Sequence, residues 1–108
     1  MEFFIPAGEM IMRANIKAKI EFFETKDGGR EGSTRKGSFG CIFVMDEVNN
    51  DCVLMLGDDV SVSPGQTVIV SVAFLAPDLV VPRLEPGKKF FLRELRSIAE
   101  GEVLEIFG

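Results

Sequence analysis

The chain of 108 residues contains no histidine, no tryptophan and no tyrosine. Imidazole is the commonest general acid–base and a frequent metal ligand, so its absence excludes histidine-based catalytic triads and zinc sites that need imidazole. The serines accordingly have no histidine to activate them. All ten aromatic residues are phenylalanine, whose ring serves burial rather than hydrogen bonding. We therefore expect no enzymatic activity, no metal and no cofactor.

Cysteine is scarce, with Cys41 and Cys52 the only two. A zinc site made of cysteine alone would need more of them. One disulfide is geometrically possible if strands bring the two together. The first twelve residues lack the basic start of a signal peptide, which favours a reducing, cytoplasmic location with both thiols free and buried. No run approaches the ~18 apolar residues that span a bilayer, so we expect no membrane association.

The net charge of −5 disfavours broad binding to nucleic acid, which depends on neutralising phosphates. The charge is uneven: residues 13–36 hold seven basic and four acidic side chains, whereas residues 46–59 hold five acidic and no basic ones. This favours two solvated loops of opposite sign, with a local binding patch as the alternative.

Apolar residues alternate with polar ones between Ala14 and Phe22, a period of two that predicts a half-buried strand. Residues 25–37 are polar and rich in glycine, and predict a loop. Further strands are expected over 38–46, 52–56, 66–76, 88–95 and 96–107.

Turn chemistry marks residues 48–51, and the prolines around residues 79–84 limit that segment to an edge or a loop. Val60 and Val62 predict a short extended piece. Gly101 indicates a bulge or a close backbone approach. Many short strands without a long helix predict an all-β barrel or sandwich over residues 13–108. Residues 1–12 form a lead segment, whose Phe3, Phe4 and Ile5 pad the core or an edge.

A phosphate-binding P-loop is absent, because residues 28–37 contain no Gly-Lys-Ser/Thr and lead into a strand. This pattern excludes nucleotide binding and favours a mobile polar loop. The paired acids Asp46-Glu47 and Asp58-Asp59 point to opposite faces of an extended chain, so they favour soluble turns over a metal site.

Basic residues gather towards the C-terminus. Strand alternation places Lys89, Phe91, Arg93 and Leu95 on one face, where charge mixes with apolar area. Arginine beside exposed aromatic residues is typical of protein interfaces, and ordinary surface charge is the alternative.

Several separate motifs, in order over about residues 13–108, resemble the C-terminal domain of translation elongation factor Tu. They are Gly28-Gly29-Arg30, Lys36-Gly37 before an aromatic strand, Ser63-Pro64-Gly65, Gly87-Lys88-Lys89-Phe90 with Arg93-Glu94, Arg96-Ser97-Ile98 with Gly101, and Phe107-Gly108.

This resemblance implies a six-stranded antiparallel β-barrel without catalysis of its own. In the family the domain packs on the GTPase domain, helps to hold aminoacyl-tRNA and contacts the exchange factor. Only about twelve residues precede the matched part, so GTP binding is not carried over. The sequence departs from the family at Ser38-Phe39-Gly40, where the family has Tyr-Arg-Pro, and at Leu95, which replaces two glycines.

These departures, with the acidic stretch at residues 46–59, favour a repurposed barrel that binds another protein. The partner would be a translation component, or a toxin that the barrel neutralises as an immunity-like protein. Binding of RNA or aminoacyl-tRNA is the alternative, which the net charge disfavours. The expected binding residues are Arg30, Lys36, Phe39, Lys89, Arg93 and Arg96.

Overall fold

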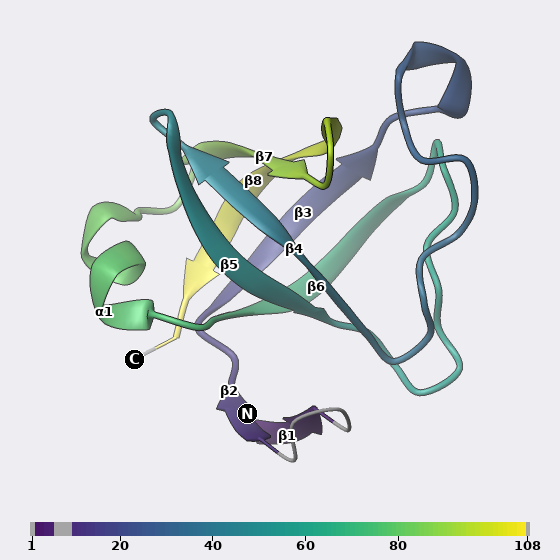
Figure 1. Ribbon diagram of the computed structural model, residues 1–108. Helices are drawn as coiled ribbons and strands as arrows, with labels where there is room; N and C mark the ends of the chain where they lie inside the picture. Colours follow the sequence, from purple (N-terminus) through teal and green to yellow (C-terminus); the bar gives the residue numbers. More distant parts are fainter. Residues whose placement is uncertain (1, 6–9, 108) are drawn as a thin grey trace.

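Six strands close into one antiparallel barrel, in the order β3-β6-β5-β4-β7-β8 (Figure 1). This computed structural model describes residues 2–5 and 10–107, with side chains from Met12 onward. The arrangement confirms the expected all-β, six-stranded antiparallel barrel. The strands are β3 (Ile16–Phe22), β4 (Ser38–Met45), β5 (Val48–Met55), β6 (Thr67–Phe74), β7 (Lys89–Arg93) and β8 (Ser97–Ile106).

Strand β3 shows how the alternation in the sequence closes the barrel. Ile16, Ala18 and Ile20 are fully buried, whereas the intervening Lys17 and Lys19 are exposed. The strand pairs with β6 on one side and β8 on the other. Because successive side chains point to opposite faces, every apolar residue of this strand enters the interior and every lysine meets solvent.

Phenylalanine rings fill the centre of the barrel. The rings of Phe43 and Phe90 stack with their centroids 4.2 Å apart, and Phe74 meets Phe43 edge to face at 4.9 Å. All three are buried. Aromatic pairs of this kind contribute about 0.5–1.5 kcal/mol each beyond their burial.

The turn predicted at residues 48–51 is wrong, because the chain reverses two residues earlier. Asp46 and Glu47 have φ of 51° and 65°, and Met45 pairs directly with Val48 across the hairpin. Two central residues with positive φ form the hairpin turn that matches the twist of the flanking strands. Strand β5 therefore begins at Val48 rather than after the Asn-Asn-Asp sequence.

One other local prediction also needs correction. The segment expected to be an edge or a loop forms two short helical turns, α1 (Pro77–Val80) and η2 (Val81–Arg83). A proline in the first helical turn lacks only an N–H group that would have no partner there. Val62 is fully buried but belongs to no strand.

A separate two-stranded sheet, β1 (Glu2–Ile5) and β2 (Met10–Arg13), precedes the barrel (Figure 1). Met12 packs with Val53 of β5 and Ala73 of β6 in a small second cluster. The side chains of Phe3, Phe4 and Ile5, predicted to pad the core or an edge, lie outside the described part. No helix among the described residues is long and apolar enough to cross a membrane.

Candidate functional site

The turn between β7 and β8 is fastened to the loop that spans residues 25–37. Arg30 Nη1 donates to both carboxylate oxygens of Glu94 at 2.7 Å. The same guanidinium donates to the carbonyl oxygens of Gly32 and Ser33. Charge-assisted hydrogen bonds are stronger than neutral ones, so this arginine fixes its own loop and the neighbouring turn at once.

A second arginine fastens the same two segments from the other side. Arg96 Nε donates to the carbonyl oxygen of Gly28 at 2.6 Å, and its Nη2 donates to that of Gly29 at 3.0 Å. A Cβ on Gly29 would lie 2.7 Å from the carbonyl carbon of Phe23 and 2.9 Å from the carbonyl oxygen of Glu24. Glycine is therefore required where the loop turns back on itself.

The rest of the loop is held along the segment that precedes β6. The N–H of Thr34 donates to the carbonyl oxygen of Val62, and the N–H of Val62 donates to Thr34 Oγ1. Ser33 and Ser63 share a hydrogen bond of 2.8 Å between their hydroxyl groups. Figure 1 shows the two segments side by side. The polar loop predicted from the sequence is therefore hydrogen-bonded to this segment at several points.

Leu95 belongs to the turn in this assembly and is 96% exposed. A hollow of about 400 Å³ adjoins it, and Ile98 contributes to the floor. We call this region the tip surface. It comprises Arg30, Glu31, Gly32, Glu94, Leu95, Arg96 and Ile98.

Phe39, one of the expected binding residues, is 4% exposed and belongs to the main core. Its ring lies 4.9 Å from the guanidinium carbon of Arg30. A cation over an aromatic face is attracted by about 0.5–1 kcal/mol at exposed sites. Phe39 thus supports Arg30 from beneath and offers little surface to a partner.

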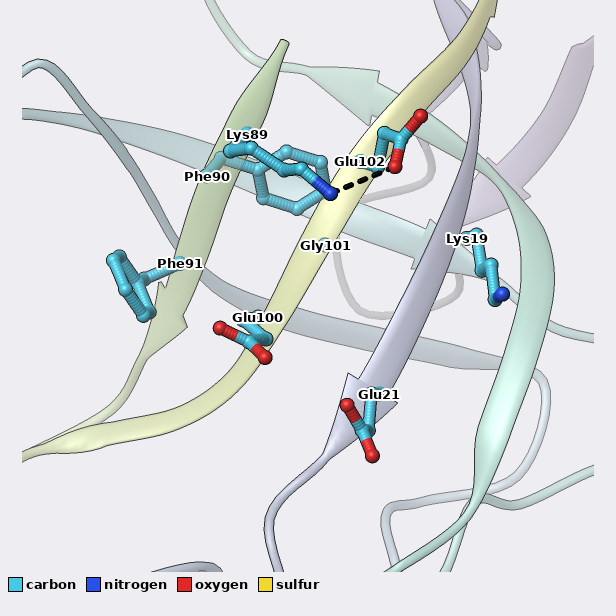
Figure 2. A pocket seen from close by; sticks show the side chains of 8 residues that line it. All are labelled: Lys19, Glu21, Lys89, Phe90, Phe91, Glu100, Gly101 and Glu102. Carbon is cyan, nitrogen blue, oxygen red and sulfur yellow. Dashed lines mark hydrogen bonds and ion pairs between the residues drawn. The ribbon is translucent and has the colours of Figure 1, made fainter. Parts of the chain in front are cut away.

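Lys89 lies apart from the tip surface, on the wall of the barrel where β3, β7 and β8 adjoin (Figure 2). A hollow of about 390 Å³ opens there above Gly101. Phe91, which is 45% exposed, stands beside it. The lining residues are Lys19, Glu21, Lys89, Phe90, Phe91, Glu100, Gly101 and Glu102.

An ion pair crosses the mouth of this wall hollow. Lys89 Nζ lies 2.8 Å from Glu102 Oε1, and Figure 2 shows the two side chains extended towards each other. The hydrogen bond and the opposite charges raise the pKa of Lys89 and lower the pKa of Glu102. Both groups meet solvent, so the pair adds little stability. Lys89 is therefore engaged with its own sheet.

Arg93 and Lys36 complete the set of expected binding residues. Arg93 ends β7 on the outer face, exposed like Lys89 and Phe91, as the alternation predicted. Lys36 is exposed at the far end of the tied loop, next to Gly37, whose N–H bonds to the carbonyl oxygen of Val60. Within residues 12–107, no ion pair or hydrogen bond joins the side chain of Lys36 to another expected binding residue.

The structure thus brings together Arg30, Phe39 and Arg96, and leaves Lys36 and Lys89 elsewhere. Glu94 was not among the predicted binding residues, and it lies 64 positions from its partner Arg30. Leu95 was named as one member of a mixed face and as a departure from the family. A single apolar residue inside the charged turn Arg-Glu-Leu-Arg was the available signal.

The described side chains include no group of three or more cysteines or carboxylates able to hold a metal ion. No protein-family model matches the chain, and no curated protein is significantly similar to it. The fold defines it as a closed, six-stranded antiparallel β-barrel.

Proposed function

We propose that this chain is a non-catalytic protein-binding module, similar to the last domain of elongation factor Tu, that contacts its partner through the tip surface. The partner is a component of translation or a toxin that the barrel neutralises. The motifs shared in order with elongation factor Tu support a component of translation as the partner. The closed antiparallel barrel is compatible with this proposal.

The observation that carries the proposal is Leu95. Single exposed leucines are common on protein surfaces, but this one projects from a turn that two arginines hold in place. A turn whose backbone is already held in place loses little freedom on binding. Binding energy concentrates in a few central residues surrounded by polar contacts, and Leu95 has charged residues, among them Glu94 and Arg96, beside it in the tip surface.

These side chains also indicate the chemistry of the partner. Arg93 and Arg96 flank the leucine in the sequence and both are exposed. Opposite charge on the partner steers association and fixes register. We therefore expect an apolar pocket on the partner with acidic residues around it.

Binding of RNA or aminoacyl-tRNA is the second candidate, and exposed basic residues such as Arg35, Lys36 and Arg93 favour it. Two further arginines, Arg30 and Arg96, are already engaged with Glu94 and with loop carbonyls. Fewer cations remain for phosphates than the sequence suggests. Filter binding across salt separates the candidates, because phosphate contacts make affinity fall steeply with salt.

The proposal is tested by affinity capture from a cell lysate, followed by titration of the purified partner. Leu95→Asp removes the apolar contact and sets a negative charge against an acidic rim. We expect its Kd to rise by at least about tenfold, as for central interface residues. Leu79→Asp is the matched control, because Leu79 is 70% exposed on α1, away from the tip surface.

Equal retention by both variants would place the contact elsewhere and overturn the role of the tip surface. A wild-type chain that retains no protein beyond those on an unrelated barrel would overturn the proposed function itself. Retention of RNA with steep salt dependence would favour the second candidate.

A further inference from the structure

Two thiols face each other across the hairpin of β4 and β5. Cys41 and Cys52 are directly opposite in the antiparallel register, and their Sγ atoms lie 3.7 Å apart. Directly opposite residues have Cα atoms about 4.5–5.5 Å apart, which falls within the range that disulfides require. An S–S bond is about 2.0 Å long, so the two Sγ atoms must approach each other by roughly 1.7 Å. Rotation of both side chains can share this movement.

The two thiols differ in their access to solvent. Cys41 is partly exposed, and both cysteines border a shallow hollow that Gly40 and Leu75 also line. Cys52 is 2% exposed. The hydrogen bond with Cys41, together with burial, raises the pKa of Cys52 well above its usual value. The first reaction with a dissolved oxidant is therefore expected at Cys41.

We propose that Cys41 and Cys52 form a redox modification site, in which a small disulfide such as oxidised glutathione converts the two thiols into a cross-strand disulfide. The proposal concerns the wall of the barrel and does not depend on the tip surface or on the identity of a partner.

The reaction has two exchange steps. The Cys41 thiolate attacks one sulfur of oxidised glutathione, which forms a mixed disulfide and releases one reduced glutathione. Cys52 then loses its proton and attacks the Cys41 sulfur, which releases the second glutathione. The protein gives up two protons and two electrons, and one oxidised glutathione becomes two reduced ones.

The fold itself should favour this disulfide. A crosslink between residues 41 and 52 restricts the unfolded chain but leaves two already adjacent strands in place. On the loop-entropy model, a loop of about twelve residues makes the disulfide roughly a hundredfold more favourable in the folded chain than in the unfolded one. Strain in the closed pair reduces this factor.

The test equilibrates the purified chain with mixtures of reduced and oxidised glutathione, folded and in guanidinium chloride. Alkylation traps the thiols, and intact mass measures the products. We expect a monomer that loses two hydrogen atoms, with an equilibrium constant at least about tenfold larger in the folded chain. Cys52→Ser should accumulate glutathione on Cys41, whereas folded Cys41→Ser should remain unmodified. Circular dichroism verifies that both variants are folded.

Three results would overturn the proposal. The first is a folded wild-type chain that stops at the mixed disulfide or remains reduced at the highest proportion of oxidised glutathione. The second is a disulfide that joins two chains. The third is an equilibrium constant for disulfide formation that is less than about tenfold larger in the folded chain than in the unfolded chain. The native strand register would then contribute too little to disulfide formation.

Discussion

Replacing Gly101 by alanine tests whether the centre of the barrel is as closely packed as the structure shows. The added Cβ would overlap the Phe90 ring, lying against Cζ and 2.7 Å from Cε2. The ring has little room to withdraw, because Phe43 stacks on it at 4.2 Å. Inserting a methyl group into a filled interior costs about 1–3 kcal/mol. For a domain of this size, about 2 kcal/mol lowers the Tm by roughly 10 °C.

The measurement is thermal and urea unfolding followed by circular dichroism, with Gly40→Ala as the matched control. A Cβ on Gly40 meets nothing nearer than the Cys52 carbonyl oxygen at 3.9 Å, so this variant should be neutral or slightly stabilising. Phe90→Leu should relieve the overlap. The double variant with Gly101→Ala should therefore be less destabilised than the sum of the single changes.

Strict additivity of the two changes, or a Tm for Gly101→Ala within about 2 °C of the Gly40→Ala control, would refute this reasoning. Either result would mean that the interior yields to an added methyl group, contrary to the close packing of protein cores.

Gly29→Ala should lower the Tm by several degrees or more, because the added Cβ overlaps the Phe23 carbonyl group. A variant whose Tm equals that of the wild type would contradict this prediction. Glu47→Gly should raise the free energy of unfolding by about 1 kcal/mol, since it removes a side chain at φ 65°. Urea titration measures the change, and a loss of stability would count against it. Lys89→Met should raise the pKa of Glu102, followed by carboxyl NMR, because the ion pair holds that pKa low. In the wild type this small stabilisation is present above the ordinary glutamate pKa and is lost as the pH falls through the lowered one. An unchanged midpoint of the Glu102 titration would show that Lys89 does not lower the pKa of Glu102.

The strands could be predicted where one face meets solvent and the other meets the core. Between Ile16 and Phe22 the alternation alone fixed both the strand and its inward face. Gly101 was predicted at a bulge or a close backbone approach, but the group that lies close to it is the ring of Phe90. The register shifts lie elsewhere, opposite Lys17/Ala18 and at Leu92/Arg93.

The failures have local physical reasons. Asn49 and Asn50 favour turns, but the hairpin reverses at Asp46 and Glu47, which adopt positive φ without a glycine. Pairing of β5 with both β4 and β6 then holds the asparagines in an extended strand. Pairing with neighbouring strands therefore overrides the preference of asparagine for turns.

The tip surface was only partly accessible to sequence reasoning. Arg30 and Arg96 were predicted to be available to a partner. In the structure, each donates hydrogen bonds to other residues of the same chain. The Glu94 carboxylate and the glycine carbonyls that receive them come from segments more than sixty positions away. No spacing rule connects residues that far apart. Arg30 is half-buried and supports the surface, whereas Arg96 both supports it and remains exposed.

Closure of the barrel determines how another chain can approach it. Each of the six barrel strands pairs with a neighbouring strand on both sides, so the barrel offers no free edge strand to an extended peptide. Among the described residues, the outer edges of β1 and β2 are where a strand from another molecule can still pair through backbone hydrogen bonds. Recognition on the rest of this protein must rely on shape and side-chain chemistry, and fibril-like stacking through the barrel wall is blocked by the same geometry.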